Sequence, residues 1–176
     1  MVVISGGARL EAHLAQLAKK LNHKQILRVG FLEGATYPDG THVATVAVIQ
    51  EFGAGPIPPR PFFRTMIAEK SDAWGNQLAR LLKKTDYDVQ KALSFMGEGI
   101  KSQLQASIVA TNSPELSAIT LMLRHMKHED PDLVVTGATV GEAARRVAAG
   151  ESSAGVSTKP LVDTGHMLNS VDYEVE

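Results

Sequence analysis

Leucines recur at helical spacing in the first part of the chain. They lie three or four residues apart, at Leu10, Leu14, Leu17 and Leu21. Charged side chains, among them Glu11 and Lys19, fall on the other faces of the same turn pattern. This arrangement predicts an amphipathic helix whose leucine face needs a surface to cover.

The next segments predict a strand, a turn and a second short helix. Residues 26–33 have strand composition, and residues 37–41 (Tyr-Pro-Asp-Gly-Thr) have turn chemistry. Residues 43–52 suit either a buried strand, by their β-branched content, or a helix ended by Gly53; we favour the helix. Four prolines and two glycines in residues 53–61 exclude a helix there and predict a stiff, extended loop.

Two long helices are predicted from the spacing of apolar residues over 62–84 and 88–108. Asp86 or Asp88 can cap the start of the second helix. Gly97 and Gly99 lie inside it and each lowers helix propensity by roughly 1 kcal/mol relative to alanine. They therefore predict a bend or a close crossing with another backbone.

Residues 111–158 differ in composition from the rest, with two short helical segments joined and flanked by linker-like residues, and they predict a helical insertion. A short helix is expected to open at residues 112–115 and run to about Met126, and a second one to span 139–149 with Thr139 as N-cap and Glu142 completing a capping box. Small residues over 150–158 predict a flexible linker.

The end of the chain adds a helical turn near 166–169 and a strand over 171–175. The predicted fold is therefore α+β, or α/β. It has a small mixed or antiparallel sheet, two long helices, one core domain formed by 1–110 and 159–176, and a helical insertion, 111–158.

Composition narrows the function classes. Eighteen basic and nineteen acidic side chains give a formal net charge of -1, so we expect no specific nucleic-acid binding. No cysteine is present, which excludes disulfides, thiolate zinc sites and a cysteine nucleophile. No stretch approaches the roughly twenty apolar residues of a membrane span. We expect a soluble product made in the cytoplasm.

Asp163-Thr164-Gly165 supports two interpretations. It matches the nucleophile signature of aspartic proteases, in which two aspartates share a proton. Only eleven residues follow it and no second such triplet exists, so a protease would have to be a homodimer built from too little chain. The structural interpretation is a turn: Asp163 or Thr164 caps it, Gly165 takes an unusual backbone angle, and Leu168 and Ser170 follow in register.

Other constellations give no catalytic, metal or cofactor site. His125, His128, Glu129 and Asp130 offer no third metal ligand at a fixed spacing, and Asp163, His166 and Ser170 lack the elbow of a serine hydrolase. No phosphate-binding glycine loop occurs. We therefore predict a protein that is not an enzyme and has no cofactor.

The stiff loop is the best candidate for an interface. It combines two cations with two aromatic side chains in the run Arg60, Pro61, Phe62, Phe63 and Arg64. Such a run suits docking on another protein. The alternative is that both phenylalanines fill the core and both arginines are solvated.

Three motifs together resemble a known family. They are Ile-Gln-Glu-Phe-Gly at 49–53, Ile-Pro-Pro-Arg-Pro-Phe-Phe-Arg at 57–64 and Leu-Val-Asp-Thr-Gly-His-Met-Leu-Asn-Ser-Val at 161–171. Their order and spacing are similar to those of the tail-completion or neck proteins of tailed bacteriophages, also called minor tail or virion morphogenesis proteins. The likeness covers about 26–108 and 159–176. The insertion departs from it, and Met167 precedes the expected anchor Leu168.

The resemblance implies a structural subunit of the virion, assembled in the host cytoplasm and located at the junction of head and tail. It implies a ring of copies, a hexamer, in contact with neighbours such as the tail terminator, head-completion protein or tail tube. Two rivals stay open: a dimeric aspartic-type hydrolase centred on Asp163, and a prophage-borne regulatory binding module that uses the insertion as its partner site.

Overall fold

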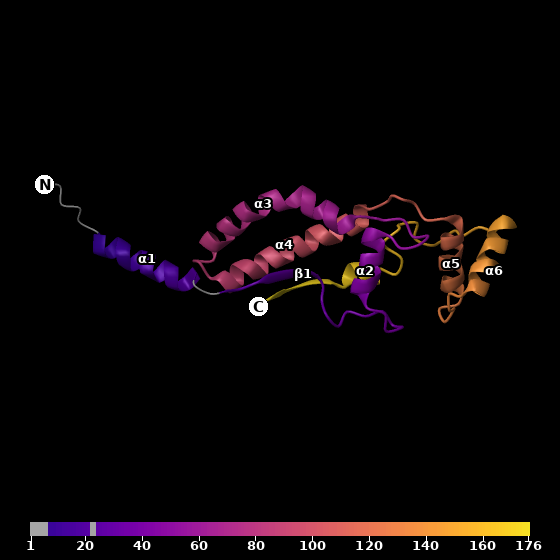
Figure 1. The fold of residues 1–176 in the computed structure, drawn as a ribbon, viewed down its shortest axis with the longest axis horizontal. Coiled ribbons are helices and arrows are strands. Elements are labelled where there is room, and N and C mark those ends of the chain that lie inside the picture. The colour runs from indigo at the N-terminus through magenta and orange to yellow at the C-terminus, as the bar shows by residue number, and fades with distance from the viewer. Residues whose placement is uncertain (1–6, 22–23) are drawn as a thin grey trace.

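The computed structural model describes residues 7–21 and 24–176, and it is an elongated α+β protein (Figure 1). Two long helices, α3 (Phe62–Lys84) and α4 (Val89–Ala110), run side by side along the body. Helix α4 also packs against the sheet formed by β1 (Leu27–Phe31) and β2 (Val171–Val175). The predicted α+β class, with a small antiparallel sheet and two long helices, is confirmed.

The sheet joins the two ends of the core sequence. Strands β1 and β2 are antiparallel, with Leu27 opposite Val175 and Phe31 opposite Val171. Alternation along both strands turns apolar side chains toward α4 and leaves Arg28 beside Glu174 on the other face. The first strand is shorter than predicted, because the chain turns away at residues 33–34.

The crossing of α4 over β2 explains one of the two glycines in α4. A Cβ on Gly97 would lie 2.3 Å from the ring of Tyr173, so only glycine fits there. The close crossing predicted for this helix is with a side chain of β2, not with a backbone. Gly99 faces open space and has no such neighbour.

The main core lies where α2 (Val43–Phe52), the start of α3, the second half of α4 and α7 (His166–Asn169) meet. Its buried members come from all of these elements, from β2 and, for Leu161, from the segment before α7: Val43, Ala47, Phe62, Met66, Leu104, Ile108, Leu161, Met167 and Val171. Residues 43–52 are helical, as favoured from the sequence. Gly53 ends this helix with a φ of 78°, and a Cβ there would lie 2.8 Å from the Ile57 carbonyl oxygen.

The insertion contains two packed helices, α5 (Ala118–Glu129) and α6 (Gly137–Ala148). They have their own apolar cluster around Met122, Met126 and Ala143, which shares no residue with the main core. In Figure 1 this pair forms one end of the molecule, and α1 (Gly7–Leu21) forms the other.

Two predicted helix starts in the insertion are wrong. Helix α5 begins at Ala118 and not at 112–115, because Ser117 caps it by accepting a hydrogen bond from the Thr120 amide. Helix α6 begins at Gly137 with Thr136 as its N-cap. Thr139 lies at the third helical position and returns a bond to the Thr136 amide at 2.7 Å, so it completes the capping box that Glu142 was expected to complete.

The start of α4 agrees with one of the two predicted caps. Asp88 accepts a hydrogen bond from the Lys91 amide at 3.0 Å. Asp86 lies in the preceding turn with a φ of 52°, and Tyr87 follows with a φ of 60°. This left-handed turn reverses the chain between α3 and α4.

Candidate interaction surface

Helix α3 follows a proline, and a residue of another helix caps it. Pro61 is the N-cap residue and has no side-chain acceptor for the first amides of the helix. Glu51, near the end of α2, supplies it: its carboxylate accepts from the Phe63 amide at 2.8 Å and from the Arg64 amide at 3.1 Å. A buried negative charge at a helix N-terminus is favourable, so this contact locks α2 onto α3.

Arg64 completes the same contact on the surface. Its Nε donates to the Glu51 carboxylate at 2.7 Å, and its Nη2 donates to the Glu51 carbonyl at 3.0 Å. Its guanidinium lies 4.7 Å from the ring centroid of Phe52, a cation–π contact. Phe52 is 60% exposed, so Glu51 holds Arg64 in place against a large uncovered aromatic ring.

The outward side of α2 is apolar. We call it the α2 face, and it consists of four exposed side chains: Ala44, Thr45, Val48 and Phe52. Thr45 is the polar member of this face, and the other polar residues of the helix, Gln50 and Glu51, are both used in contacts with Arg60 and α3. A helix that is apolar all round is normally buried on all sides, whereas α2 is covered on one side only.

The five residues of the predicted interface loop divide between inside and outside. Arg60 is only 4% exposed, and Phe62 is fully buried in the main core. Phe63 is half-buried against the core, whereas Pro61 and Arg64 are exposed. Neither alternative from the sequence holds as a whole, since one phenylalanine fills the core but its neighbouring arginine is buried rather than solvated.

Arg60 joins the core to the start of the insertion. It donates to the carbonyls of Pro114 and Glu115 at 2.9 and 3.4 Å, and to the Gln50 side chain at 3.1 Å. Burial lowers the pKa of Arg60, and the charge of Arg124 lowers it further. Pro114 and Glu115 thus lie before α5, with their carbonyls bonded to Arg60.

Arg124, on α5, holds the end of the insertion. It donates to the carbonyls of Ser157 and Lys159 at 2.7 and 2.9 Å and to that of Pro160 at 3.2 Å. Burial lowers its pKa, and the charge of Asp163 acts in the opposite direction. Two arginines thus fasten both ends of the insertion through main-chain carbonyls.

The Asp163 turn lies next to this anchor. The Asp163 carboxylate is half-exposed and lies 3.5 Å from Arg124 Nε. Gly165 has a φ of 79°, and the Thr164 hydroxyl accepts from the His166 amide at 3.3 Å. Leu168 packs against the main core, and Ser170 donates from its hydroxyl to the His166 carbonyl.

The other constellations weighed from the sequence do not converge. His166 Nε2 lies 2.8 Å from the Thr36 carbonyl oxygen, and the Ser170 hydroxyl donates to the His166 carbonyl. His125 pairs with Glu129 at 3.4 Å. Within 7–21 and 24–176, no three His, Asp or Glu side chains gather as they would around a metal ion.

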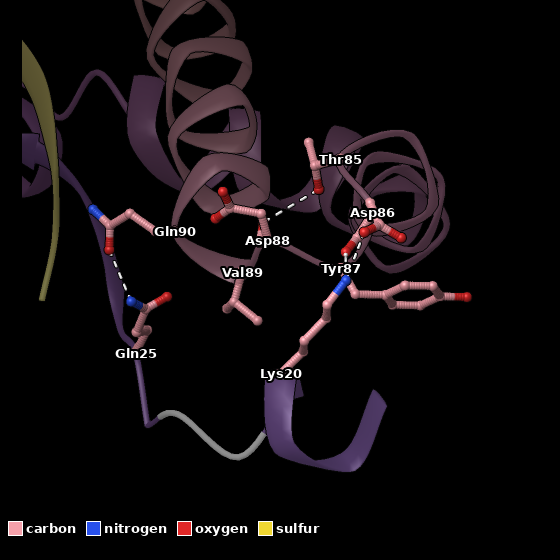
Figure 2. A pocket seen from close by; sticks show the side chains of 8 residues that line it. All are labelled: Lys20, Gln25, Thr85, Asp86, Tyr87, Asp88, Val89 and Gln90. Carbon is pink, nitrogen blue, oxygen red and sulfur yellow. Dashed lines mark hydrogen bonds and ion pairs between the residues drawn. The ribbon is translucent and has the colours of Figure 1, made fainter. Parts of the chain in front are cut away.

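A cavity of about 580 Å³ lies where α1 meets the turn between α3 and α4 (Figure 2). Lys20 reaches across it to Asp86 at 2.6 Å, and Gln25 donates to Gln90 at 2.8 Å. The hydrogen bond from Lys20 lowers the pKa of Asp86. Both members of the ion pair contact water, so α1 is tied to the body by a weak contact.

Three of these anchors were not predicted as such: Glu51, Arg60 and Arg124. For Glu51 a signal exists, because a helix that opens after proline lacks a side-chain cap and requires an acceptor from elsewhere. For the two arginines the partners are main-chain carbonyls, which every residue has, so the sequence does not indicate which residues will bind them.

Together the fold and this surface define an elongated α+β protein with an uncovered apolar helix face beside a fixed arginine. Comparisons with protein-family models, with curated proteins and with solved structures gave no match to the chain. Among the helices that the structure describes, none is both long enough and apolar enough to cross a membrane.

Proposed function

We propose that this chain is a structural subunit of a tailed-bacteriophage or prophage virion, of the neck or tail-completion class, which joins or completes the tail at the head. In this proposal it acts without catalysis. It assembles as a ring of copies, six by the resemblance, and contacts other neck and tail proteins.

The meeting of the three sequence motifs supports this proposal. Glu51 of the first motif caps the helix that the second motif opens, and Phe62 of the second motif shares the main core with Leu161 and Met167 of the third. Motifs separated by about a hundred residues therefore build one structural unit. Their resemblance to the phage family thus concerns a common scaffold and does not depend on isolated tripeptides.

The α2 face is the observation that carries the proposal. A monomer that leaves an apolar helix side exposed beside a fixed arginine has the composition of an interface, in which aromatic residues and arginine are enriched. Both strands of the sheet also have one unpaired edge among the described residues, where a neighbouring chain can add a strand.

The test is deletion of the gene in the phage or prophage that encodes it, followed by electron microscopy of the particles. We expect full heads beside unattached or unfinished tails, and restoration of whole particles by the wild-type gene. Intact particles at the normal yield without the protein would refute the proposal. A prophage-borne regulator would also differ in sedimentation, since it would not travel with tails or necks.

Two arginine variants distinguish a residue that contacts another protein from a residue that stabilises the fold. Arg64→Ala removes an exposed group of the surface, and we expect a folded protein that complements the deletion poorly. Arg60→Ala removes a buried anchor, so we expect loss of stability first, seen as a lower denaturation midpoint. If Arg64→Ala folds and complements the deletion fully, Arg64 is not part of the interface.

A further inference from the structure

Basic side chains gather at one end of the pair of long helices. They come from the last turn of α1, from the segment between α1 and β1, from the end of α3 and from the first turn of α4. In Figure 1 the end of α1 lies beside the turn that joins α3 to α4, and the hydrogen bond from Lys20 to Asp86 holds it there. We call this surface the basic end, and it consists of seven exposed residues: Lys19, Lys20, Lys24, Arg80, Lys83, Lys84 and Lys91.

The basic end has a large local excess of positive charge. Two carboxylates lie among its seven cations, those of Asp86 and Asp88 in the turn before α4, so its net charge is +5 in a chain with a formal net charge of -1. The charges on the outer face of the sheet, Arg28, Glu174 and Glu176, pair with one another. The remainder of the chain therefore has a net negative charge, and the concentrated positive field at one end attracts polyanions.

Six of the seven cations have no carboxylate partner within the described structure. Lys20 pairs with Asp86, whereas the other six side chains form no ion pair among the residues that the structure describes. Basic residues in the last turn of a helix favour its dipole, which accounts for those at the end of α3. It does not account for Lys24, which lies outside the helices, or for Lys91, which lies at the positive end of α4. Helix stability therefore does not explain all of this charge.

The residue type favours phosphate groups over a folded protein as the partner. Six of the seven cations are lysines, which are depleted in protein–protein interfaces. On DNA, lysine and arginine release condensed counterions from the phosphates, and this release drives binding. Duplex DNA also carries one negative charge per about 1.7 Å of its axis, so cations spread over several elements can contact phosphates at the same time. A single strand would require aromatic side chains for base stacking, whereas the turn before α4 offers one half-buried ring, Tyr87.

We propose that the basic end binds the phosphate backbone of double-stranded DNA without sequence preference. The formal net charge of -1 predicts no specific nucleic-acid binding, and the two statements agree, because contacts to phosphates carry no sequence information. The inference does not rest on the proposed virion role. Binding by the purified protein and the assembly of particles are measured separately, so either can fail while the other holds.

Fluorescence anisotropy of a labelled duplex of arbitrary sequence, titrated with the purified full chain, tests the proposal. With about four to five phosphate contacts, binding should weaken by roughly 150- to 500-fold between about 50 and 200 mM salt. A second duplex of different sequence should bind with the same affinity.

Neutral variants at the end of α3 test where the duplex binds. Arg80→Gln, Lys83→Gln and Lys84→Gln combined should weaken binding about tenfold or more at low salt. The slope of log affinity against log salt should fall by about 2–3, since each phosphate contact contributes about 1 to it.

The matched control changes the net charge by the same amount at other places. It replaces three exposed cations outside the basic end, Lys70→Gln, Lys127→Gln and Arg145→Gln. Its affinity and its slope should stay close to the wild-type values. An equal loss in this control would show that overall charge alone matters, and would overturn the proposal.

A second variant decides the question if the α3 variant does not fold, as judged by circular dichroism. It combines Lys19→Gln, Lys24→Gln and Lys91→Gln, on other elements of the same surface, and should also lower the slope by about 2–3. A folded variant of either kind with the wild-type slope would contradict the proposal.

Three further results would overturn the proposal. They are absence of binding to the duplex at about 50 mM salt, tighter binding to a single-stranded oligonucleotide, and tighter binding to polyglutamate or to vesicles that contain anionic lipid. Tighter binding to polyglutamate or to the vesicles would assign the surface to an acidic protein or to a membrane instead.

Discussion

Three charged side chains, Glu51, Arg60 and Arg124, do most of their bonding to the main chain. Each is largely buried and satisfied by amides or carbonyls rather than by charge alone. A buried charge is tolerated when hydrogen bonds replace its water, and removing it leaves the partner groups unpaired. These residues therefore determine how α2, α3 and the insertion are placed.

Glu51→Ala should destabilise the protein by about 2–3 kcal/mol, because two amides of α3 and the Arg64 guanidinium lose their acceptor. Urea denaturation followed by circular dichroism measures this. Glu69→Ala is the control, since Glu69 is an exposed residue of α3, and the midpoint of this variant should stay close to the wild type. Equal effects of the two changes would contradict the capping role.

Asp163→Asn separates a structural carboxylate from a catalytic one. Its ion pair with Arg124 is half-exposed, so we expect a loss of about 1 kcal/mol or less and normal rescue of particle assembly. Denaturation and complementation of the gene deletion are measured on the same variant. A fully stable variant that fails to complement would favour the aspartic hydrolase.

At the scale of elements, the packing of α4 on β2 determines where glycine is required. The two glycines of α4 are two residues apart and look equivalent in the sequence, yet only Gly97 meets the Tyr173 ring. The same pair of elements is joined at its rim by Lys101 and Asp172, 3.0 Å apart.

Gly97→Ala should destabilise the fold by about 1–3 kcal/mol through overpacking, in spite of its better helix propensity. Gly99→Ala adds the same methyl group two residues away into open space and should stabilise the fold by up to about 1 kcal/mol. Thermal unfolding of the two variants compares them. Stabilisation by both changes would show that Tyr173 moves aside at no cost.

The Lys101–Asp172 pair makes a small, pH-dependent contribution. The hydrogen bond lowers the pKa of Asp172 and raises that of Lys101. The Asp172 contribution is therefore present above the unfolded value near pH 4 and lost as pH falls through the lower folded pKa. The Lys101 contribution is present below about pH 10 and lost as pH rises further.

Asp172→Asn should lower stability at pH 7 and lose that difference in acid. The effect should be small because water screens both groups. Denaturation at pH 7 and near pH 2.5 measures it, with Asp72→Asn, an exposed carboxylate of α3, as control. A gap between wild type and Asp172→Asn that widens in acid would contradict this linkage.

At the scale of the whole molecule, two apolar clusters are connected by arginine-to-carbonyl bonds instead of shared packing. The main core and the cluster around Met122 have no residue in common. A mutation that destabilises one cluster should therefore have little effect on the stability of the other.

Met122→Ala should remove amide protection in α5 and α6 while α4 keeps its own, because truncating a buried methionine costs about 2–5 kcal/mol locally. Hydrogen exchange with mass spectrometry resolves the two regions. Met66→Ala, in the main core, should show the reverse pattern. Uniform loss of protection in both variants would indicate one cooperative unit.

The sequence by itself determined the elements that depend on local periodicity and turn chemistry. The leucine spacing of α1, the two long helices, the stop at Gly53 and a cap at Asp86 or Asp88 were all predicted, since neighbours within a few residues decide them. The starts of α5 and α6 were misplaced because several residues nearby can cap a helix, and tertiary contacts select among them.

Only the tertiary structure shows which side chains of the Pro-Arg-Pro loop are buried. The sequence presented Arg60 and Arg64 as equivalent cations beside two phenylalanines, but Arg60 meets main-chain carbonyls fifty-four residues away and Arg64 meets Glu51 on the surface. The tertiary structure also decided that cations as far apart in the sequence as Lys19 and Lys91 lie at one end of the α3–α4 pair. Local pattern shows that a segment is charged or apolar, whereas only the folded chain shows which other segments lie beside it.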